Sequence, residues 1–162
     1  MADSHKPSLR LTDEERLTAG PAADAVACFR LMAFASQRLR QLMDQRLKED
    51  GLTSQQGFLQ TIVRTLGRPT LGQVAAAMST THQNAKQVAL VLERKGMLRI
   101  VADNQDARVK RLEATEAGAA GWSDRDAGDY AAIAGWFAAL SGDEQRLLAQ
   151  LLSRLAVSLP KG

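Results

Sequence analysis

The sequence is poor in several residue types that mark particular classes of protein. Its 162 residues include one cysteine, which excludes an internal disulfide bond and suits a reducing compartment. Aromatic residues make up only 4% of the chain, which favours helices over an all-β fold. No apolar run approaches the ~20 residues needed to span a bilayer, and the first residues lack the apolar core of a signal peptide. We therefore expect a cytoplasmic protein without a membrane-spanning segment.

Residue sets that support catalysis or bind metals are equally scarce. The chain has two histidines, His5 and His82, and no cluster of Cys, Asp or Glu near His82 that could complete a metal site. No nucleophile–base set and no phosphate-binding loop is visible. The sequence predicts neither an enzyme nor a bound cofactor or metal ion.

Positive charge is concentrated in one part of the chain, although the net charge is only +3. Residues 68–111 contain eight basic and three acidic side chains, a balance of +5, whereas residues 112–162 contain four basic and seven acidic ones, a balance of −3. Contacts with the phosphates of a duplex require such a local excess of Lys and Arg. The segregation indicates a nucleic-acid-binding surface in residues 68–111.

Most of the remaining sequence has the periodicity of helices. Apolar residues recur at helical spacing over residues 23–49 and predict a helix of roughly 25 residues. Thr53 and Gln56 form a capping box that opens a second helix, and Thr70 caps a short third helix that reaches Met78. These three helices precede the basic segment.

Two further helices are predicted after the basic segment. The first runs from Thr115 to about Leu140 and contains four glycines, so it is either bent or crosses another helix closely. Ser141 and Glu144 form a capping box that opens the last helix, which has a leucine-rich face. Such a face needs a partner, so the long helices at both ends of the chain are predicted to form a dimerisation platform.

Residues 70–115 combine a pair of short helices with a basic hairpin, the order of a winged helix-turn-helix. The start of the second helix carries side chains suited to reading base edges, since Gln and Asn pair with adenine while His and Lys serve guanine or phosphate. The predicted DNA-binding set on this helix is Thr81, as N-cap, with His82, Gln83, Asn84, Lys86 and Gln87. An ordinary polar helix face is the alternative.

The hairpin that follows is predicted to act as the wing, with strands over residues 97–101 and 109–112. Arg108 lies near its tip, where a long cation can enter the narrow minor groove. Asp106 could orient the Arg108 guanidinium by a charge-assisted hydrogen bond, or the two could form a surface ion pair of little energetic value. Asp106, Arg108 and Lys110 are the predicted DNA-binding residues of the wing.

These features together resemble the MarR family of transcriptional regulators over residues 23–159. The family's wing typically shows Asp, Pro, then Asp-Arg-Arg, a strand and Leu-Thr-x-x-Gly. Here it reads Asp103-Asn-Gln-Asp106-Ala-Arg108, followed by Leu112-Glu-Ala-Thr115-Glu-Ala-Gly118. The segments Leu92-Glu-Arg-Lys-Gly96 and Leu52-Thr53 also match. Asn104 replaces the usual proline and Ala107 the first arginine, which removes one phosphate-directed charge.

The resemblance implies a homodimer whose two winged heads occupy successive major grooves of a pseudo-palindromic site. It also implies that a small, often phenolic or lipophilic, effector releases the DNA by binding between the platform and the head. The candidate wall residues of such a pocket, for which plain core packing is the alternative, are Phe29, Met32, Phe58 and Trp122.

One subset of the family senses organic peroxides through a cysteine near the start of the first long helix, and Cys28 has a similar local context. Arg30 lies about 200° around the helix from Cys28, so its help in activating the thiol is doubtful. The peroxide sensors also use several tyrosines, whereas this chain has only Tyr130. A buried structural cysteine is therefore favoured over a redox sensor.

The sequence as a whole predicts a mainly α fold with a small β-wing. We expect an N-terminal tail over residues 1–21, dimerisation helices over 22–50 and 115–160, and a winged helix-turn-helix DNA-binding domain over 52–114, in a single intertwined fold. The predicted function is that of a homodimeric, sequence-specific transcriptional repressor that binds double-stranded DNA and is released by a small effector. A winged-helix module that binds protein rather than DNA is a more distant alternative.

Overall fold

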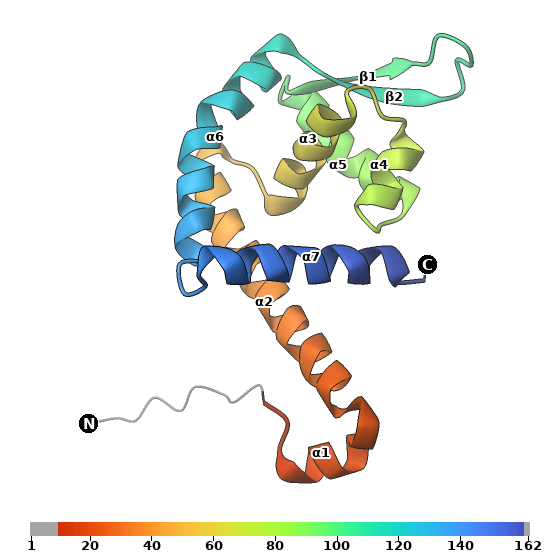
Figure 1. The fold of residues 1–162 in the computed structure, drawn as a ribbon. Helices are drawn as coiled ribbons and strands as arrows, with labels where there is room; N and C mark the ends of the chain where they lie inside the picture. The colour runs from red at the N-terminus through yellow and green to blue at the C-terminus, as the bar shows by residue number, and fades with distance from the viewer. Residues whose placement is uncertain (1–9, 161–162) are drawn as a thin grey trace. The chain divides into compact units, whose positions relative to one another are not determined.

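The computed structural model describes residues 10–160. The chain divides into two compact units, one ending at Gly57 and the other beginning at Phe58. Long helices dominate both units, and one small sheet lies in the second unit (Figure 1).

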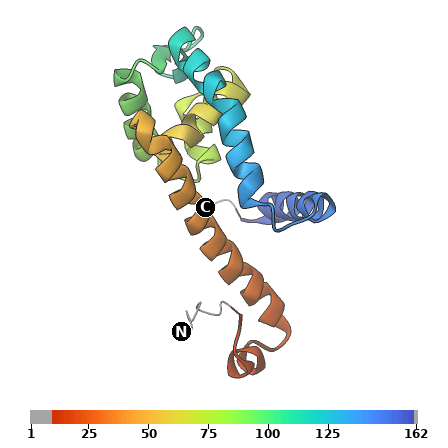
Figure 2. The same cartoon turned by 90° about the vertical axis from the view of Figure 1, so that its left-hand side faces the viewer.

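The first unit begins with a short helix inside the segment predicted to be a tail. Helix α1 (Asp13–Ala19) packs against α2 (Ala23–Leu47), with the 3-10 turn η1 (Gly20–Ala22) between them (Figure 2). Thr12 caps α1, since its backbone N–H donates to Glu15 Oε2 at 2.9 Å and its Oγ1 accepts from the Glu15 N–H at 3.2 Å. The missed signal is therefore the same capping box that located other helices. Residues 1–9 of the predicted tail lie outside the described residues.

Helix α2 has the predicted start and a C-terminal end two residues earlier than expected, where the 3-10 turn η2 (Lys48–Asp50) follows. Leu47 is its only buried residue among those described, while Phe29 and Phe34 are exposed. By length and composition alone, the helical stretch Asp13–Asp50 could cross a membrane. Helices that bury an apolar face against protein meet the same criterion, so a single stretch is weak evidence for a span.

The winged head is built by three helices and the sheet. Helix α3 (Ser54–Leu66) begins after the predicted Thr53–Gln56 capping box, and α4 (Leu71–Ala77) after Thr70, whose Oγ1 accepts from the Gln73 N–H at 3.1 Å. Helix α5 (His82–Arg94) packs on α4 and on strand β1. Their buried side chains form one core: Leu59, Val63, Leu71, Val74, Ala85, Ala89, Leu92, Leu98 and Leu112.

The wing is a two-stranded antiparallel sheet of β1 (Leu98–Ala102) and β2 (Lys110–Ala114), in which Ile100 faces Leu112. Both strands begin one residue later than predicted. The Met97 N–H bonds to the Leu92 carbonyl at 3.0 Å as part of the end of α5, where Gly96 has a φ of 70°. The Val109 N–H bonds to the Asp106 carbonyl at 2.9 Å within the tip turn. The N–H groups of both residues thus bond within turns, while their carbonyls accept the N–H groups of Thr115 and Asp103 across the hairpin.

Two helices complete the second unit, α6 (Glu116–Trp136) and α7 (Gly142–Ser158), which run crosswise to each other (Figure 1, Figure 2). A Cβ added at Gly118 would lie 2.0 Å from the Met97 carbonyl oxygen, whereas at Gly121 and Gly135 it would meet nothing within 4 Å. Gly118 thus permits a close approach, but to the start of the wing rather than to another helix. Helix α6 also ends four residues earlier than predicted.

Candidate nucleic-acid interface

The packing of α5 fixes which of its faces can meet a ligand. Ala85, Val88, Ala89 and Leu92 are all buried, as their spacing predicts. Thr81 caps the helix, because its Oγ1 accepts from the Asn84 N–H at 3.1 Å. The opposite face of α5 therefore points to solvent, because the buried face packs into the core beneath the sheet.

The outward face presents most of the predicted base-reading residues. His82, Gln83, Lys86 and Gln87 are exposed in the first two turns. Asn84 is half-buried, and its Nδ2 donates to Thr80 Oγ1 at 2.9 Å, so part of this side chain holds the turn before the helix. Base reading by this set remains a prediction, in which Thr81 and Asn84 also have structural roles.

The loop between β1 and β2 projects beyond α4 and α5 (Figure 1) and carries Arg108, while Lys110 is the first residue of β2. The Arg108 side chain is 96% exposed, and its Nε lies 3.8 Å from Asp106 Oδ1. The same Asp106 oxygen accepts the backbone N–H of Arg108 at 3.0 Å. Asp106 thus shapes the backbone of the tip, while its ion pair with the exposed guanidinium has the geometry of a weak surface contact.

A cavity of about 430 Å³ lies between the start of α5 and the wing. Its lining includes His82 from α5, Arg108 and Lys110 from the wing, and Thr70 from the start of α4. The Lys110 Nζ donates to the Ala107 carbonyl at 3.1 Å, which keeps its charge beside the tip. Residues predicted separately on the helix and on the wing therefore meet on one cationic surface, as a contact with the backbone phosphates of DNA requires.

The network at the root of the wing was not predicted as a structural feature. Arg111 forms an ion pair with Asp103, and its Nη1 donates to the Arg68 carbonyl at 2.9 Å. The hydrogen bond from Arg111, with two backbone N–H donors, lowers the pKa of Asp103 to about 2. Arg68 in turn pairs with Glu113 of β2. Pairs separated by so many residues have no signature in the sequence beyond their charges.

A second long-range link joins α3 to α6. The Arg64 Nη1 donates to Asp126 Oδ2 at 2.8 Å, and its Nη2 donates to the Tyr130 hydroxyl at 3.4 Å. These bonds raise the pKa of Arg64 above its ordinary value. Tyr130, the single tyrosine of the chain, thus contacts Arg64.

The four candidate wall residues of the effector pocket differ in exposure. Phe29 is 69% and Phe58 51% exposed, while Met32 and Trp122 are half-buried. Within one chain, plain core packing does not fit Phe29 and Phe58, and it stays an alternative for Met32 and Trp122. A ligand pocket lined by them remains a prediction.

Cys28 is a free and exposed thiol, so the favoured prediction of a buried structural cysteine is wrong. The chain leaves it on the surface of α2, which has little buried surface along its length. Arg30 donates from Nη2 to Glu15 Oε1 at 2.8 Å, and this bond is the main cause of a Glu15 pKa of about 2. Arg30 thus serves the junction of α1 and α2 rather than the thiol.

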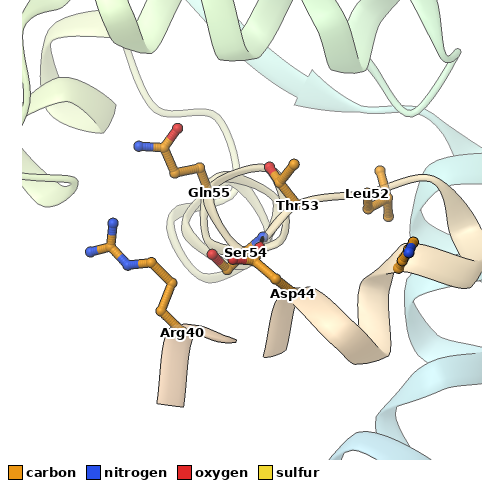
Figure 3. Close-up of a pocket in the computed structure, with 7 residues that line it drawn as sticks. Arg40, Asp44, Leu52, Thr53, Ser54 and Gln55 are labelled. Atoms are coloured by element: carbon orange, nitrogen blue, oxygen red, sulfur yellow. Dashed lines mark hydrogen bonds between the residues drawn. The ribbon is translucent and has the colours of Figure 1, made fainter. Parts of the chain in front are cut away.

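A shallow cavity of about 460 Å³ lies between the end of α2 and the start of α3 (Figure 3). Arg40 and Lys48 contribute charge to its lining, but Asp44 Oδ1 accepts the Ser54 N–H at 2.6 Å. A carboxylate of the chain itself thus occupies the first turn of α3, where an anion would otherwise be stabilised. Over residues 10–160, no group of three or more His, Cys, Asp or Glu could hold a metal ion, and His5 lies outside that range.

Comparison with solved structures identifies the fold. A MarR family transcriptional regulator from Silicibacter pomeroyi superposes with a TM-score of 0.75 at 14% sequence identity, over 85% of this chain and 92% of that one. This is the MarR fold. A mutant of E. coli MarR in complex with operator DNA gives a TM-score of 0.74 at 19% identity, over 86% of this chain and 99% of that one.

A further MarR-like neighbour concerns regulation by a small molecule. BpsR from Bordetella bronchiseptica, solved to explain how 6-hydroxynicotinic acid regulates its DNA binding, gives a TM-score of 0.70 at 21% identity, over 78% of this chain and 90% of that one. No protein-family model and no curated protein matches the sequence. At these identities the likeness establishes the fold, and the predicted winged-helix class is confirmed.

Proposed function

We propose that this protein is a DNA-binding transcriptional repressor that acts as a homodimer on a pseudo-palindromic operator. The observation that carries the proposal is the cationic cavity where His82 of α5 meets Arg108 and Lys110 of the wing. The operator complex of E. coli MarR, which has the same fold, supports the same use of this surface. In a dimer, the two heads would meet half-sites about one helical turn apart, ~34–36 Å.

The dimer is supported by the large apolar side chains that the chain leaves exposed on its long helices. Phe29 and Phe34 on α2, with Leu147 and Leu151 on α7, are each at least 48% exposed. Exposed apolar side chains in such number are typical of an interface with another protein surface. A second copy of the chain satisfies the two-fold symmetry of a palindromic operator.

The experiment is selection of duplexes from a random pool, followed by affinity measurements at several salt concentrations. A palindromic motif with steep salt dependence is expected. Arg108→Ala should weaken binding to all duplexes and reduce the slope of log K against log salt by about one. Arg146→Ala, which removes an equal charge from a side chain of α7 that is 71% exposed, is the control. Equal binding by Arg108→Ala and the wild-type protein would contradict the proposed use of the wing.

We further propose that a small phenolic or lipophilic effector releases the DNA. The regulation of BpsR by 6-hydroxynicotinic acid supports this, since that protein has the same fold. An effector of this kind acts only if it binds the DNA-free arrangement of the two heads more tightly than the DNA-bound one. Aromatic acids and lipophilic phenols should be screened for release of the selected duplex, with Phe58→Ala as the first test of the predicted pocket.

A further inference from the structure

Two arginines of the wing have opposite environments although they lie only three residues apart. Arg108 is 96% exposed, whereas the side chain of Arg111 is 30% exposed. The guanidinium of Arg111 uses Nε for the ion pair with Asp103 and Nη1 for the Arg68 carbonyl. Two of its three donor nitrogens therefore make hydrogen bonds within the protein.

Both carboxylate oxygens of Asp103 also accept hydrogen bonds from within the chain. Its carboxylate is 12% exposed, and Oδ1 accepts the N–H groups of Gln105 at 2.8 Å and Asp106 at 3.2 Å, while Oδ2 faces Arg111. One carboxylate therefore connects the turn that leads to Arg108 with the strand that leads away from it. The low pKa of Asp103, about 2, keeps the group charged at neutral pH.

The same part of β2 is bound to the segment between α3 and α4. The Leu112 N–H donates to the Pro69 carbonyl at 2.9 Å, and Thr70 forms a β-bridge with Arg111. With the Arg111 bond to the Arg68 carbonyl, three consecutive residues of this segment hold β2. The wing is thus attached to the helical head through Arg111 and its neighbours.

We propose that Asp103 and Arg111 are positioning residues, which set the angle of the wing so that Arg108 reaches the DNA, and that Arg111 itself contacts no phosphate. This inference rests on the proposed function. It reverses the role that charge alone assigns to Arg111, which would count it among the cations facing the duplex. The two cations of the hairpin then have different roles: Arg108 binds the DNA, and Arg111 fixes the position of the wing.

Asp103→Asn gives a test in which the two interpretations predict opposite signs. The substitution removes a negative charge near the DNA, so a purely electrostatic surface would bind DNA more tightly. Asn keeps the side-chain oxygen that accepts the turn N–H groups, so the change is confined to the ion pair. If the pair positions the wing, affinity should instead fall by roughly five- to tenfold, with an unchanged salt slope.

Arg111→Lys tests the other partner without changing charge. A lysine cannot donate to the Asp103 carboxylate and the Arg68 carbonyl in the planar fork geometry of arginine. Affinity should fall as in Asp103→Asn while the salt slope stays that of the wild-type protein. Lys110→Gln is the contrasting variant, expected to lower the slope by about one because its exposed cation faces the cavity.

A measurement on the free protein distinguishes failure of the positioning role from failure of the proposed DNA-binding function. Hydrogen exchange of the Leu112 amide in the free protein should become roughly tenfold faster in Asp103→Asn and Arg111→Lys and stay unchanged in Lys110→Gln. Unchanged exchange in both ion-pair variants, or tighter DNA binding by Asp103→Asn, would overturn the positioning role. A wild-type protein that retains no duplex would overturn the proposed function instead.

Discussion

Leucine side chains of the winged head and of α7 have similar chemistry and very different surroundings. Leu59, Leu92, Leu98 and Leu112 are at most 1% exposed in the head, whereas Leu147, Leu151 and Leu152 are 43–56% exposed on α7. No residue of α7 is buried. The head therefore completes its core within one chain, while α7 has the surface of a helix that packs against another molecule. The contrast predicts that mutations in the two regions will differ in their dependence on protein concentration.

The largest effect is expected from Leu151→Glu on α7. In a two-fold interface each substitution acts twice, and each replaces the burial of a leucine, about 1.5–3 kcal/mol, by the cost of desolvating a carboxylate. The dissociation constant of the dimer should rise by at least about 100-fold. Sedimentation or light scattering over a range of concentrations measures this change.

Ser153→Glu is the matched control, because it introduces the same charge at an exposed position of the same helix. Residue 153 lies about 200° around the helix from residue 151, on the side away from the leucines. The substitution should therefore leave the dimer intact. A wild-type protein that is monomeric at high concentration would remove the basis of the comparison and of the proposed dimer.

A smaller loss, confined to the head, is expected for Leu92→Ala. Leu92 is fully buried, and truncation of a core leucine costs about 2–5 kcal/mol because a cavity remains. Urea unfolding of the head should show this loss to the same extent at every protein concentration. A loss that disappears on dilution would mean that the core of the head is completed by the partner.

Two glycines of α6 allow the comparison to be made within one helix. Gly118→Ala places its Cβ 2.0 Å from the Met97 carbonyl oxygen, so the backbone must shift, at a cost of about 1–3 kcal/mol. Gly121→Ala meets nothing within 4 Å and should stabilise the helix by up to about 1 kcal/mol. Opposite signs in thermal unfolding are expected, and equal effects would show that Gly118 is not a packing constraint.

The features that the sequence predicted well depend on neighbours in the chain. Capping boxes at Thr53, Thr70 and Ser141 and the buried face of α5 involve residues at most a few turns apart, so their spacing alone specifies them. The same rule applied to Thr12 would have found α1. Local physics therefore accounts for most of the element boundaries.

The features that the sequence did not reveal depend on tertiary proximity. Asp103 with Arg111, and Arg64 with Asp126, are ion pairs whose partners are chosen by the fold. The close approach at Gly118 likewise depends on where α6 meets the wing. In the wing, the predicted set of Asp106, Arg108 and Lys110 left Arg111 without a role, because spacing cannot distinguish an exposed arginine from one that is bound within the chain.

The smallest expected effect is the change in stability on acid titration, which can be followed separately in the wing and at the α1–α2 junction. The pKa of Asp103 in the wing and that of Glu15 at the α1–α2 junction are both lowered to about 2, mainly by hydrogen bonds from Arg111 and Arg30. A lowered pKa means that each pair stabilises the folded state above the ordinary pKa, near 4, and that this contribution is lost as the pH falls toward 2. NMR titration of the two carboxyl groups should therefore show midpoints well below those of the unfolded chain. Arg30→Gln should return the pKa of Glu15 toward its ordinary value and leave that of Asp103 unchanged, because the low pKa of Asp103 arises from Arg111 and from the N–H groups of Gln105 and Asp106. A joint shift of both carboxyl groups would instead require electrostatic coupling between the wing and the α1–α2 junction.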